Sequence, residues 1–267
     1  MRRVPWIGLM ALTFLAPTPA AAAATRPAPV VLILLENHAY DQIVGSPSAP
    51  YLNGTFIPGG KLFSRYRALT HPSLPNYLAI TSGASQGCTS DACRVGSFTA
   101  DNLFHQLQTA GLSWRSWEES MQTPCQARSR GLYVTKHNPA VYYADLASTC
   151  TADDVAYPGA PPGSLPSFTF VTPNVCDDMH SCPVASGDAW LKAHVPALRA
   201  AGAEVIVTFD EGVSSDQHIL TAEVGPTVAA GSVDASAYTH YGLLAGLERH
   251  FGLPRLGAAA SAAALPV

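Results

Sequence analysis

The sequence predicts an α/β fold with a mostly parallel central sheet, and three short apolar runs carry that prediction. They are residues 30–35, 167–172 and 205–209. Runs this short and rich in branched side chains are typical of strands buried on both faces of a parallel sheet. Each run ends abruptly in polar residues. We therefore expect the three strand ends to meet at one site beyond the carboxyl edge of the sheet.

Helices are predicted between and after these strands. The segments are residues 76–81 after Pro75, 99–110, 189–201 and 241–250. Gly252 and Pro254 terminate the last segment, because neither residue continues a helix well. Pro and Gly cluster in residues 157–166, which predicts a loop. Since no repeat or linker divides the chain, we expect one domain over residues 25–267.

Residues 1–24 are interpreted as a signal peptide. A basic start at Arg2 and Arg3 precedes an apolar run over residues 4–15 and small residues over 19–24. A membrane anchor is the alternative, but the apolar run is shorter than the roughly 20 residues that a spanning helix needs. We therefore expect a secreted or periplasmic protein with no stable membrane insertion.

Composition restricts the partners and indicates disulfides. A formal net charge of -4 with 13% charged residues makes nucleic acid an improbable partner. An even set of six cysteines in an exported chain favours disulfides over metal thiolates. Other pairings are possible, but close spacing favours local bridges and leaves one further pair: Cys88–Cys93, Cys176–Cys182 and Cys125–Cys150.

Two acidic pairs follow predicted strands. Glu36 and Asn37 end the first run, and Asp210 and Glu211 end the last. Carboxylates that share a site repel each other unless a cation neutralises them, and oxygen ligands suit hard divalent ions. Either pair alone could be a solvated turn. Because both pairs follow buried strands, we expect one divalent ion there, with Mg, Mn or Ca favoured.

Ser73 lies just before a predicted helix start, in a stretch whose prolines restrict the backbone. A hydroxyl at that position meets the positive end of the helix and its free amides, which suit a phosphate anion. The alternative is an ordinary N-cap serine. Local sequence alone leaves both interpretations open.

Four histidines lie in polar, turn-rich contexts: His71, His137, His180 and His240. Each could donate to phosphate oxygens, protonate a leaving alkoxide or bind metal. A single histidine in such a context is more often structural or simply exposed, so none is assigned a role from its neighbours alone.

Together these motifs resemble the phosphoesterase family that contains bacterial acid phosphatases and phospholipases C, a branch of the alkaline phosphatase-like superfamily. The resemblance covers most of residues 25–267, and its motifs occur in the family's order. The matching segments are residues 36–41, 70–77, 136–139, 170–180, 187–191, 208–212 and 238–252.

The resemblance implies a three-layer α/β/α sandwich and a role for each site residue. Ser73 would be the nucleophile and Asn76 would stabilise the transferred phosphoryl group. One metal ion would be held by Glu36, Asn37, Asp210, Glu211 and the Ser73 oxygen. The phosphate pocket would be lined by His71, His137, His180 and His240, with Asp178 beside them. Two-metal members have His beside the later Asp, so Glu211 favours a single hard ion.

The function implied is that of a small secreted acid phosphatase, which hydrolyses phosphate monoesters through a phosphoserine. Phosphorylated small molecules and phosphoinositides, including phosphatidylinositol 3-phosphate, are the substrates that follow from the resemblance. A phospholipase C-type phosphodiesterase is the main alternative. A sulfatase is disfavoured because no cysteine lies near Ser73, and a non-catalytic binding protein because every expected position is filled.

Overall fold

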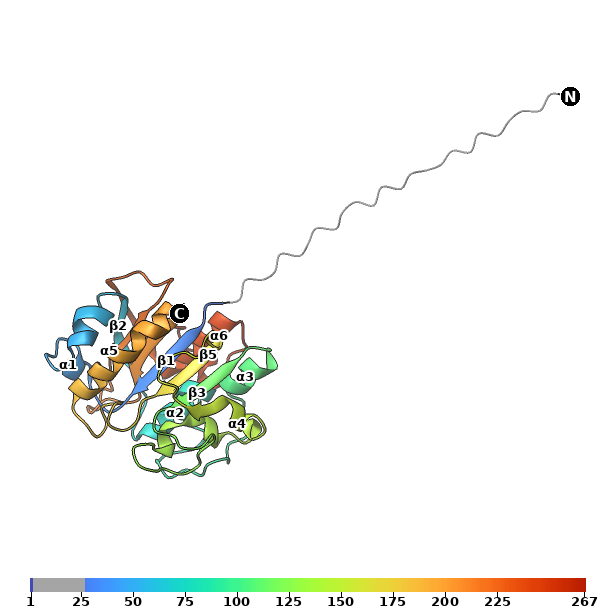
Figure 1. Cartoon of the computed structure of the whole chain (residues 1–267), viewed down its shortest axis with the longest axis horizontal. Helices are drawn as coiled ribbons and strands as arrows, with labels where there is room; N and C mark the ends of the chain where they lie inside the picture. Colours follow the sequence, from blue (N-terminus) through green and yellow to red (C-terminus); the bar gives the residue numbers. More distant parts are fainter. Residues whose placement is uncertain (2–26) are drawn as a thin grey trace.

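A computed structural model describes Met1 and residues 27–267, so the predicted signal peptide lies outside the described residues. The eight-stranded sheet has the order β4-β3-β5-β1-β6-β7-β2-β8. Helices cover both of its faces, which gives the three layers of an α/β/α sandwich (Figure 1). The predicted fold class is confirmed.

The strands are β1 (Val30–Leu35), β2 (Lys61–Arg67), β3 (Trp114–Glu118), β4 (Asp154–Ala156), β5 (Phe168–Thr172), β6 (Glu204–Phe209), β7 (Thr221–Val224) and β8 (Ser232–Thr239). The α-helices are α1 (Tyr40–Ile43), α2 (Ser73–Ser82), α3 (Leu103–Thr109), α4 (Cys150–Asp153), α5 (Val184–Ala200) and α6 (His240–Phe251). Short helical turns include η1 (Leu52–Phe56), η2 (Thr135–His137), η3 (Pro139–Tyr142), η4 (Ala144–Leu146) and η5 (Gly257–Ala260).

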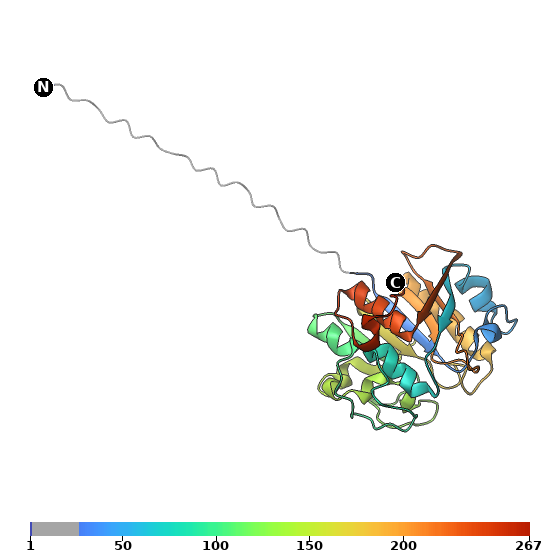
Figure 2. The same cartoon turned by 180° about the vertical axis from the view of Figure 1, so that it is seen from behind.

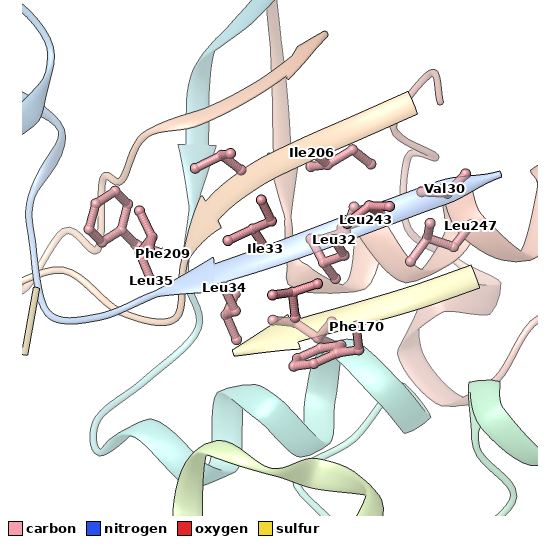
Figure 3. Close-up of a cluster of buried hydrophobic side chains, with 14 of the residues drawn as sticks. Val30, Leu32, Ile33, Leu34, Leu35, Phe170, Ile206, Phe209, Leu243 and Leu247 are labelled. Carbon is pink, nitrogen blue, oxygen red and sulfur yellow. The ribbon is translucent and has the colours of Figure 1, made fainter. Parts of the chain in front are cut away.

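Strand β1 lies in the middle of the sheet. It pairs in parallel with β5 on one side and with β6 on the other. All six of its side chains are fully buried. Figure 3 shows Leu32 and Val30 beside Leu243 and Leu247 of α6. Burial on both faces explains why this segment is apolar without alternation.

The two helical layers are unequal. Helices α1 and α5 lie on one face of the sheet, and α5 packs on β6 (Figure 1). Helices α2, α3 and α6 pack against one another on the opposite face (Figure 2). Helix α2 therefore lies against the same face of the sheet as α3 and α6. Its first turn is at the carboxyl ends of the parallel strands.

Several helix boundaries differ from the predicted ones. Helix α2 begins at Ser73 rather than after Pro75, because a proline fits the first turn of a helix, where its missing N–H costs no hydrogen bond. Helix α3 begins only at Leu103, after the side chain of Asn102 caps the His105 amide. Helix α5 starts at Val184, which places Asp188 inside it.

Asp188 has a structural role that the neighbouring sequence does not indicate. Its two carboxylate oxygens accept hydrogen bonds from the backbone amides of Tyr51 and Leu52, at 2.9 and 2.8 Å. These amides belong to the start of η1, where no earlier carbonyl of the turn is available. Asp188 thus fastens η1 to α5.

The three disulfides pair as predicted: Cys88–Cys93, Cys125–Cys150 and Cys176–Cys182. Each closes a short loop, and two of these loops, residues 88–93 and 176–182, contribute residues to the site described below. Within the described part of the chain, no helix combines the length and the apolar character that crossing a bilayer requires.

Candidate active site

Backbone hydrogen bonds tie the polar ends of three parallel strands together. The Glu36 amide donates to the Asp178 carbonyl at 2.8 Å, and the Asp210 amide donates to the Leu35 carbonyl at 2.9 Å. Asn37 has a positive φ of 56°, a conformation that Asn tolerates better than most residues. Its amide donates to Oδ1 of Asp210 at 3.2 Å. The acidic pairs after β1 and β6 are therefore neighbours.

The carboxylate of Glu36 is the centre of the site. Its Oε2 accepts a 3.0 Å hydrogen bond from the hydroxyl of Ser73. Its Oε1 accepts a 2.7 Å hydrogen bond from Tyr77 and forms a 3.0 Å ion pair with His137 Nε2. Burial raises the pKa of Glu36, but the positive charge of His137 and these hydrogen bonds outweigh it and leave the pKa lowered. Glu36 is thus held as a carboxylate.

Ser73 is the first residue of α2 and is buried. Its hydroxyl donates to Glu36 rather than capping the helix, and Pro72 occupies the N-cap position. The ordinary N-cap interpretation therefore does not apply. The Ser73 oxygen lies at the positive end of α2, where charge developing on a phosphoryl group is stabilised.

The side chain of Asn76 is hydrogen-bonded to backbone groups of the loop that precedes α2. Its Oδ1 accepts from the amides of Leu69 and Thr70 at 3.2 and 3.3 Å. Its Nδ2 donates to the carbonyls of Thr70 and Pro72 at 2.8 and 3.3 Å. Every donor and acceptor of this amide is occupied, so the geometry favours shaping the Ser73 loop over the expected contact with a phosphoryl group.

The carboxylates of the acidic cluster lie close enough to repel one another. Burial and then the negative charges of Glu36 and Glu211 raise the pKa of Asp210 well above its ordinary value. Asp210 is fully buried, and its Oδ2 has no hydrogen-bond partner among the described residues. A buried carboxylate oxygen without a partner is costly unless a cation satisfies it.

This oxygen-rich donor set fits a hard divalent ion. The ligand-capable atoms of Glu36, His137 and His180 also lie within 4.8 Å of one another. His137 already interacts with two carboxylates, so the group of Glu36, His137 and His180 is less available to a cation. The unpartnered Oδ2 of Asp210 is the stronger indication of a cation site.

His71 is placed at the rim of the site, with its side chain 48% exposed. Its Nδ1 lies 2.9 Å from Oε2 of Glu211, and its Nε2 contacts the side-chain amide of Gln217. Burial raises the pKa of Glu211 to about 7, although the adjacent His71 opposes this. His71 also lines a hollow of about 260 Å³ together with Thr70, Thr89 and Tyr241.

His137 is buried between two carboxylates. Its Nε2 faces Glu36 and its Nδ1 lies 3.1 Å from Oδ2 of Asp178. Burial alone would lower the pKa of His137, but Glu36 and Asp178 raise it to about 9. The ring also stacks on Tyr77 at 5.4 Å between centroids. His137 is therefore a fixed positive charge behind Ser73.

His180 is exposed, as is His71. Its backbone amide donates to Oδ1 of Asp178 at 2.7 Å, and its Nδ1 contacts the hydroxyl of Ser181 at 3.0 Å. Its ring lies 5.7 Å from that of His137. The His180 ring is therefore on the solvent side of the buried His137.

His240 does not face the phosphate pocket, contrary to expectation. Its Nε2 donates to the Asp210 carbonyl at 2.6 Å, and its Nδ1 accepts from the Tyr66 hydroxyl at 3.0 Å. Burial lowers its pKa to about 4, so the ring is neutral. A neutral ring with both nitrogens occupied cannot deliver a proton to a leaving group. Its geometry suits holding the backbone of Asp210.

Sequence reasoning missed five residues that complete this arrangement: Tyr66, Tyr77, Asp91, Lys136 and Gln217. Tyr77 follows Ser73 by four positions, so helical spacing could have placed it on the same face. Lys136 is adjacent to His137. The remaining three come from segments whose approach to the site only the tertiary structure determines.

Known proteins resemble this chain over most of its length. A model of the phosphoesterase family matches residues 55–254. The chain belongs to the phosphoesterase family. This phosphoesterase is 34% identical to a phosphatidylinositol-3-phosphatase of Mycobacterium tuberculosis, over 98% of this chain and 92% of that protein. It is 29% identical to a probable acid phosphatase of Kluyveromyces lactis, of which it spans 58%.

Solved structures support the fold. The phosphoesterase superposes on a protein of the alkaline phosphatase superfamily from Vibrio parahaemolyticus with a TM-score of 0.59 and 14% identity, over 85% of this chain and 69% of that one. A murine ectonucleotide pyrophosphatase/phosphodiesterase gives a TM-score of 0.62 and 9% identity, over 85% and 96%. The chain is a hydrolase of phosphoric ester bonds with an alkaline phosphatase-like fold.

Proposed function

We propose that this phosphoesterase is a secreted, metal-dependent acid phosphatase whose single domain, residues 25–267, hydrolyses phosphate monoesters through a phosphoserine at Ser73. One observation carries the proposal: the Ser73 hydroxyl, at the first residue of α2, donates to a buried carboxylate that two further groups hold in place. A hydroxyl fixed in this way is oriented for nucleophilic attack.

The residues that would hold the metal ion are Glu36, Asn37, Asp210 and Glu211, with the Ser73 oxygen. Mutual repulsion within this set and the unpartnered Oδ2 of Asp210 support that assignment. When bound, a hard divalent ion supplies Lewis-acid chemistry, which lowers the pKa of a hydroxyl and neutralises phosphoryl charge.

In the first step, the Ser73 oxygen bonds to phosphorus as the bond to the leaving oxygen breaks. The hydroxyl proton departs along the existing hydrogen bond toward Glu36. The positive charge of His137 behind Glu36 and the amino-terminal end of α2 stabilise the charge on the phosphoryl oxygens. The free alcohol leaves and phosphoserine remains.

Protonation of the leaving alkoxide is assigned to His180, because it is the exposed imidazole nearest His137. Water then attacks phosphorus from the vacated side and gives its proton to the same ring. As the bond from phosphorus to the Ser73 oxygen breaks, the proton held on Glu36 returns to that oxygen, so that phosphate is released and the Ser73 hydroxyl is restored. His71, held by Glu211, is placed to contact the substrate at the rim. Imidazole acid catalysis favours an acidic to neutral optimum.

Phosphatidylinositol 3-phosphate is the lipid substrate we propose, alongside small phosphate monoesters. The support is the 34% identity to a phosphatidylinositol-3-phosphatase over nearly the whole length of both chains. The half-exposed His71 at the rim would allow a large headgroup to reach Ser73 without entering the buried part of the site.

The test is phosphate release by the purified protein from p-nitrophenyl phosphate, bis-p-nitrophenyl phosphate and phosphatidylinositol 3-phosphate, with and without chelator. We expect chelator-sensitive cleavage that is faster for the monoesters. Preference for the diester would instead support a phosphodiesterase. Ser73→Ala should abolish turnover while the protein remains folded, with the melting temperature lowered only by the loss of the hydrogen bond to Glu36. A variant that retained appreciable turnover would remove Ser73 from its role.

A further inference from the structure

A charged side chain outside the assigned set contacts the nucleophile. Lys136 Nζ lies 3.4 Å from Oγ of Ser73 and 3.0 Å from Oδ2 of Asp91. Its side chain is 22% exposed, so the residue is partly accessible to solvent. A phosphoryl group bonded to the Ser73 oxygen would bring its non-bridging oxygens within reach of this ammonium.

We propose that Lys136, positioned by Asp91, binds a non-bridging phosphoryl oxygen and makes the site selective for dianionic phosphate monoesters over monoanionic diesters. This inference rests on the proposed role of Ser73 as the nucleophile. It adds to that role a residue that determines the substrate class.

The position of Lys136 is fixed by one carboxylate that contacts two parts of the site. Oδ2 of Asp91 accepts from Lys136, and its Oδ1 accepts from the backbone amide of Leu74 at 3.0 Å. Leu74 follows Ser73 in the first turn of α2. Asp91 therefore holds the ammonium at a set distance from the amino-terminal end of that helix.

Asp91 itself lies in a closed loop. The Cys88–Cys93 disulfide joins residues five positions apart on either side of it. Lys136 in turn lies in η2, next to the buried His137. Both partners of the Lys136–Asp91 ion pair thus come from restrained backbone, as a group that must be placed before substrate arrives requires.

The charges of the site explain the expected selectivity. Glu36, Asp210 and Glu211 are acidic, whereas Lys136 provides a cation 3.4 Å from the Ser73 oxygen. A monoester dianion carries one more negative charge than a diester and interacts more strongly with a nearby ammonium. Loss of the ammonium should therefore weaken monoester turnover more than diester turnover.

The experiment compares Lys136→Met with the native protein on p-nitrophenyl phosphate and bis-p-nitrophenyl phosphate. We expect the ratio of kcat/KM for monoester to that for diester to fall about tenfold or more, an effect of the size that one close charge produces. Lys136→Arg should retain part of the selectivity. Lys192→Met, which removes an exposed lysine of α5, is the matched control and should leave the ratio unchanged.

Asp91→Asn tests the positioning residue separately. It should lower the same ratio, and the Asp91→Asn/Lys136→Met double variant should show no further loss, because the two side chains act as a unit. Equal losses on both esters in Lys136→Met, with an unchanged melting temperature, would overturn the proposal. Additive losses in the double variant would overturn the positioning role assigned to Asp91.

Binding measurements keep the inference separate from the proposed function. Calorimetry with inorganic phosphate and with dimethyl phosphate, at pH 8 and with Mg²⁺ supplied, compares a dianion with a monoanion of similar shape. Lys136→Met should weaken phosphate binding more than dimethyl phosphate binding. A native protein that cleaves neither ester would refute the proposed function, whereas equal weakening of both ligands would refute the role of Lys136.

Discussion

The hydroxyl of Tyr77 donates a 2.7 Å hydrogen bond to Oε1 of Glu36, the carboxylate whose other oxygen accepts from Ser73. Ser73 and Tyr77 are one helical turn apart, so α2 contacts both oxygens of the same carboxylate from one face. Glu36 is consequently oriented by the helix that carries the proposed nucleophile, and a small rotation of α2 would disturb both contacts together.

Replacing Tyr77 by Phe should lower kcat roughly tenfold and reduce stability by about 1.5–3 kcal/mol, the usual contribution of a hydrogen bond to a charged group. Chemical denaturation and steady-state kinetics measure the two effects. Tyr142→Phe is the control, because Tyr142 is equally buried but its hydroxyl makes no hydrogen bond within the described residues. Similar losses in both variants would show that Tyr77 acts only through packing.

Asp210→Asn should lower metal affinity by at least tenfold and stabilise the metal-free protein at pH 7.5. The physical reason is that the variant removes one of three mutually repelling carboxylates, of which Asp210 is the fully buried one without a partner for Oδ2. Calorimetric metal titration and thermal unfolding in chelator provide the readouts. Unchanged metal affinity would exclude Asp210 from the ligand set.

Asn76→Ala should destabilise the protein by about 1–3 kcal/mol, since it removes a fully buried side chain whose hydrogen bonds satisfy partly buried backbone groups of the Ser73 loop. Activity should fall as well, but substrate affinity should fall least, because the side chain makes no contact in the open part of the site. Denaturant titration with kcat and KM measurement separates these effects. A loss of activity at unchanged stability would favour the phosphoryl contact instead.

A buried acid far from the site predicts a pH effect. Glu223 of β7 faces Glu204 of β6 and Lys61 of β2, and burial raises its pKa from 4.5 to about 7. The folded protein therefore binds this proton more tightly than the unfolded chain, so the contribution of Glu223 to stability is greatest below pH 4.5 and is lost as pH rises through 7.

Glu223→Gln should remove that dependence, because the amide keeps the shape of the protonated acid but cannot ionise. Relative to the native protein, the variant should gain up to about 3 kcal/mol between pH 5 and pH 8. Denaturant unfolding at several pH values measures the difference. A constant difference across this range would show that Glu223 remains in one protonation state.

The parts of the fold that the sequence predicts are those where burial leaves one clear pattern. Strands β1, β5 and β6 are apolar throughout because both of their faces are covered. Strand β3 was missed because Arg115 and Glu118 interrupt its apolar pattern, and β8 because it lies at the sheet edge with most side chains exposed. Their places in the sheet depend on pairing, which local sequence does not encode.

The candidate site divides in the same way. Glu36 and Asp210 could be placed together because parallel strands end at one edge of a sheet, whereas Ser73 was added to them by the resemblance to the phosphoesterase family. The orientation of the His240 ring depends on a hydrogen bond from Tyr66, and the position of Lys136 depends on an ion pair with Asp91. Both of these partners are far away in the sequence. Local context cannot distinguish a histidine that supports the backbone from one that meets the substrate.

The central place of β1 also has a consequence for biosynthesis. This strand leaves the ribosome first, yet its two neighbours are the fifth and sixth strands of the chain. Asp210 therefore joins Glu36 only after most of the polypeptide has been made, and a truncated chain that ends before β6 would carry Ser73 and Glu36 without Asp210 and Glu211. Such an incomplete chain is expected to be inactive, because it lacks the proposed metal ligands that follow β6.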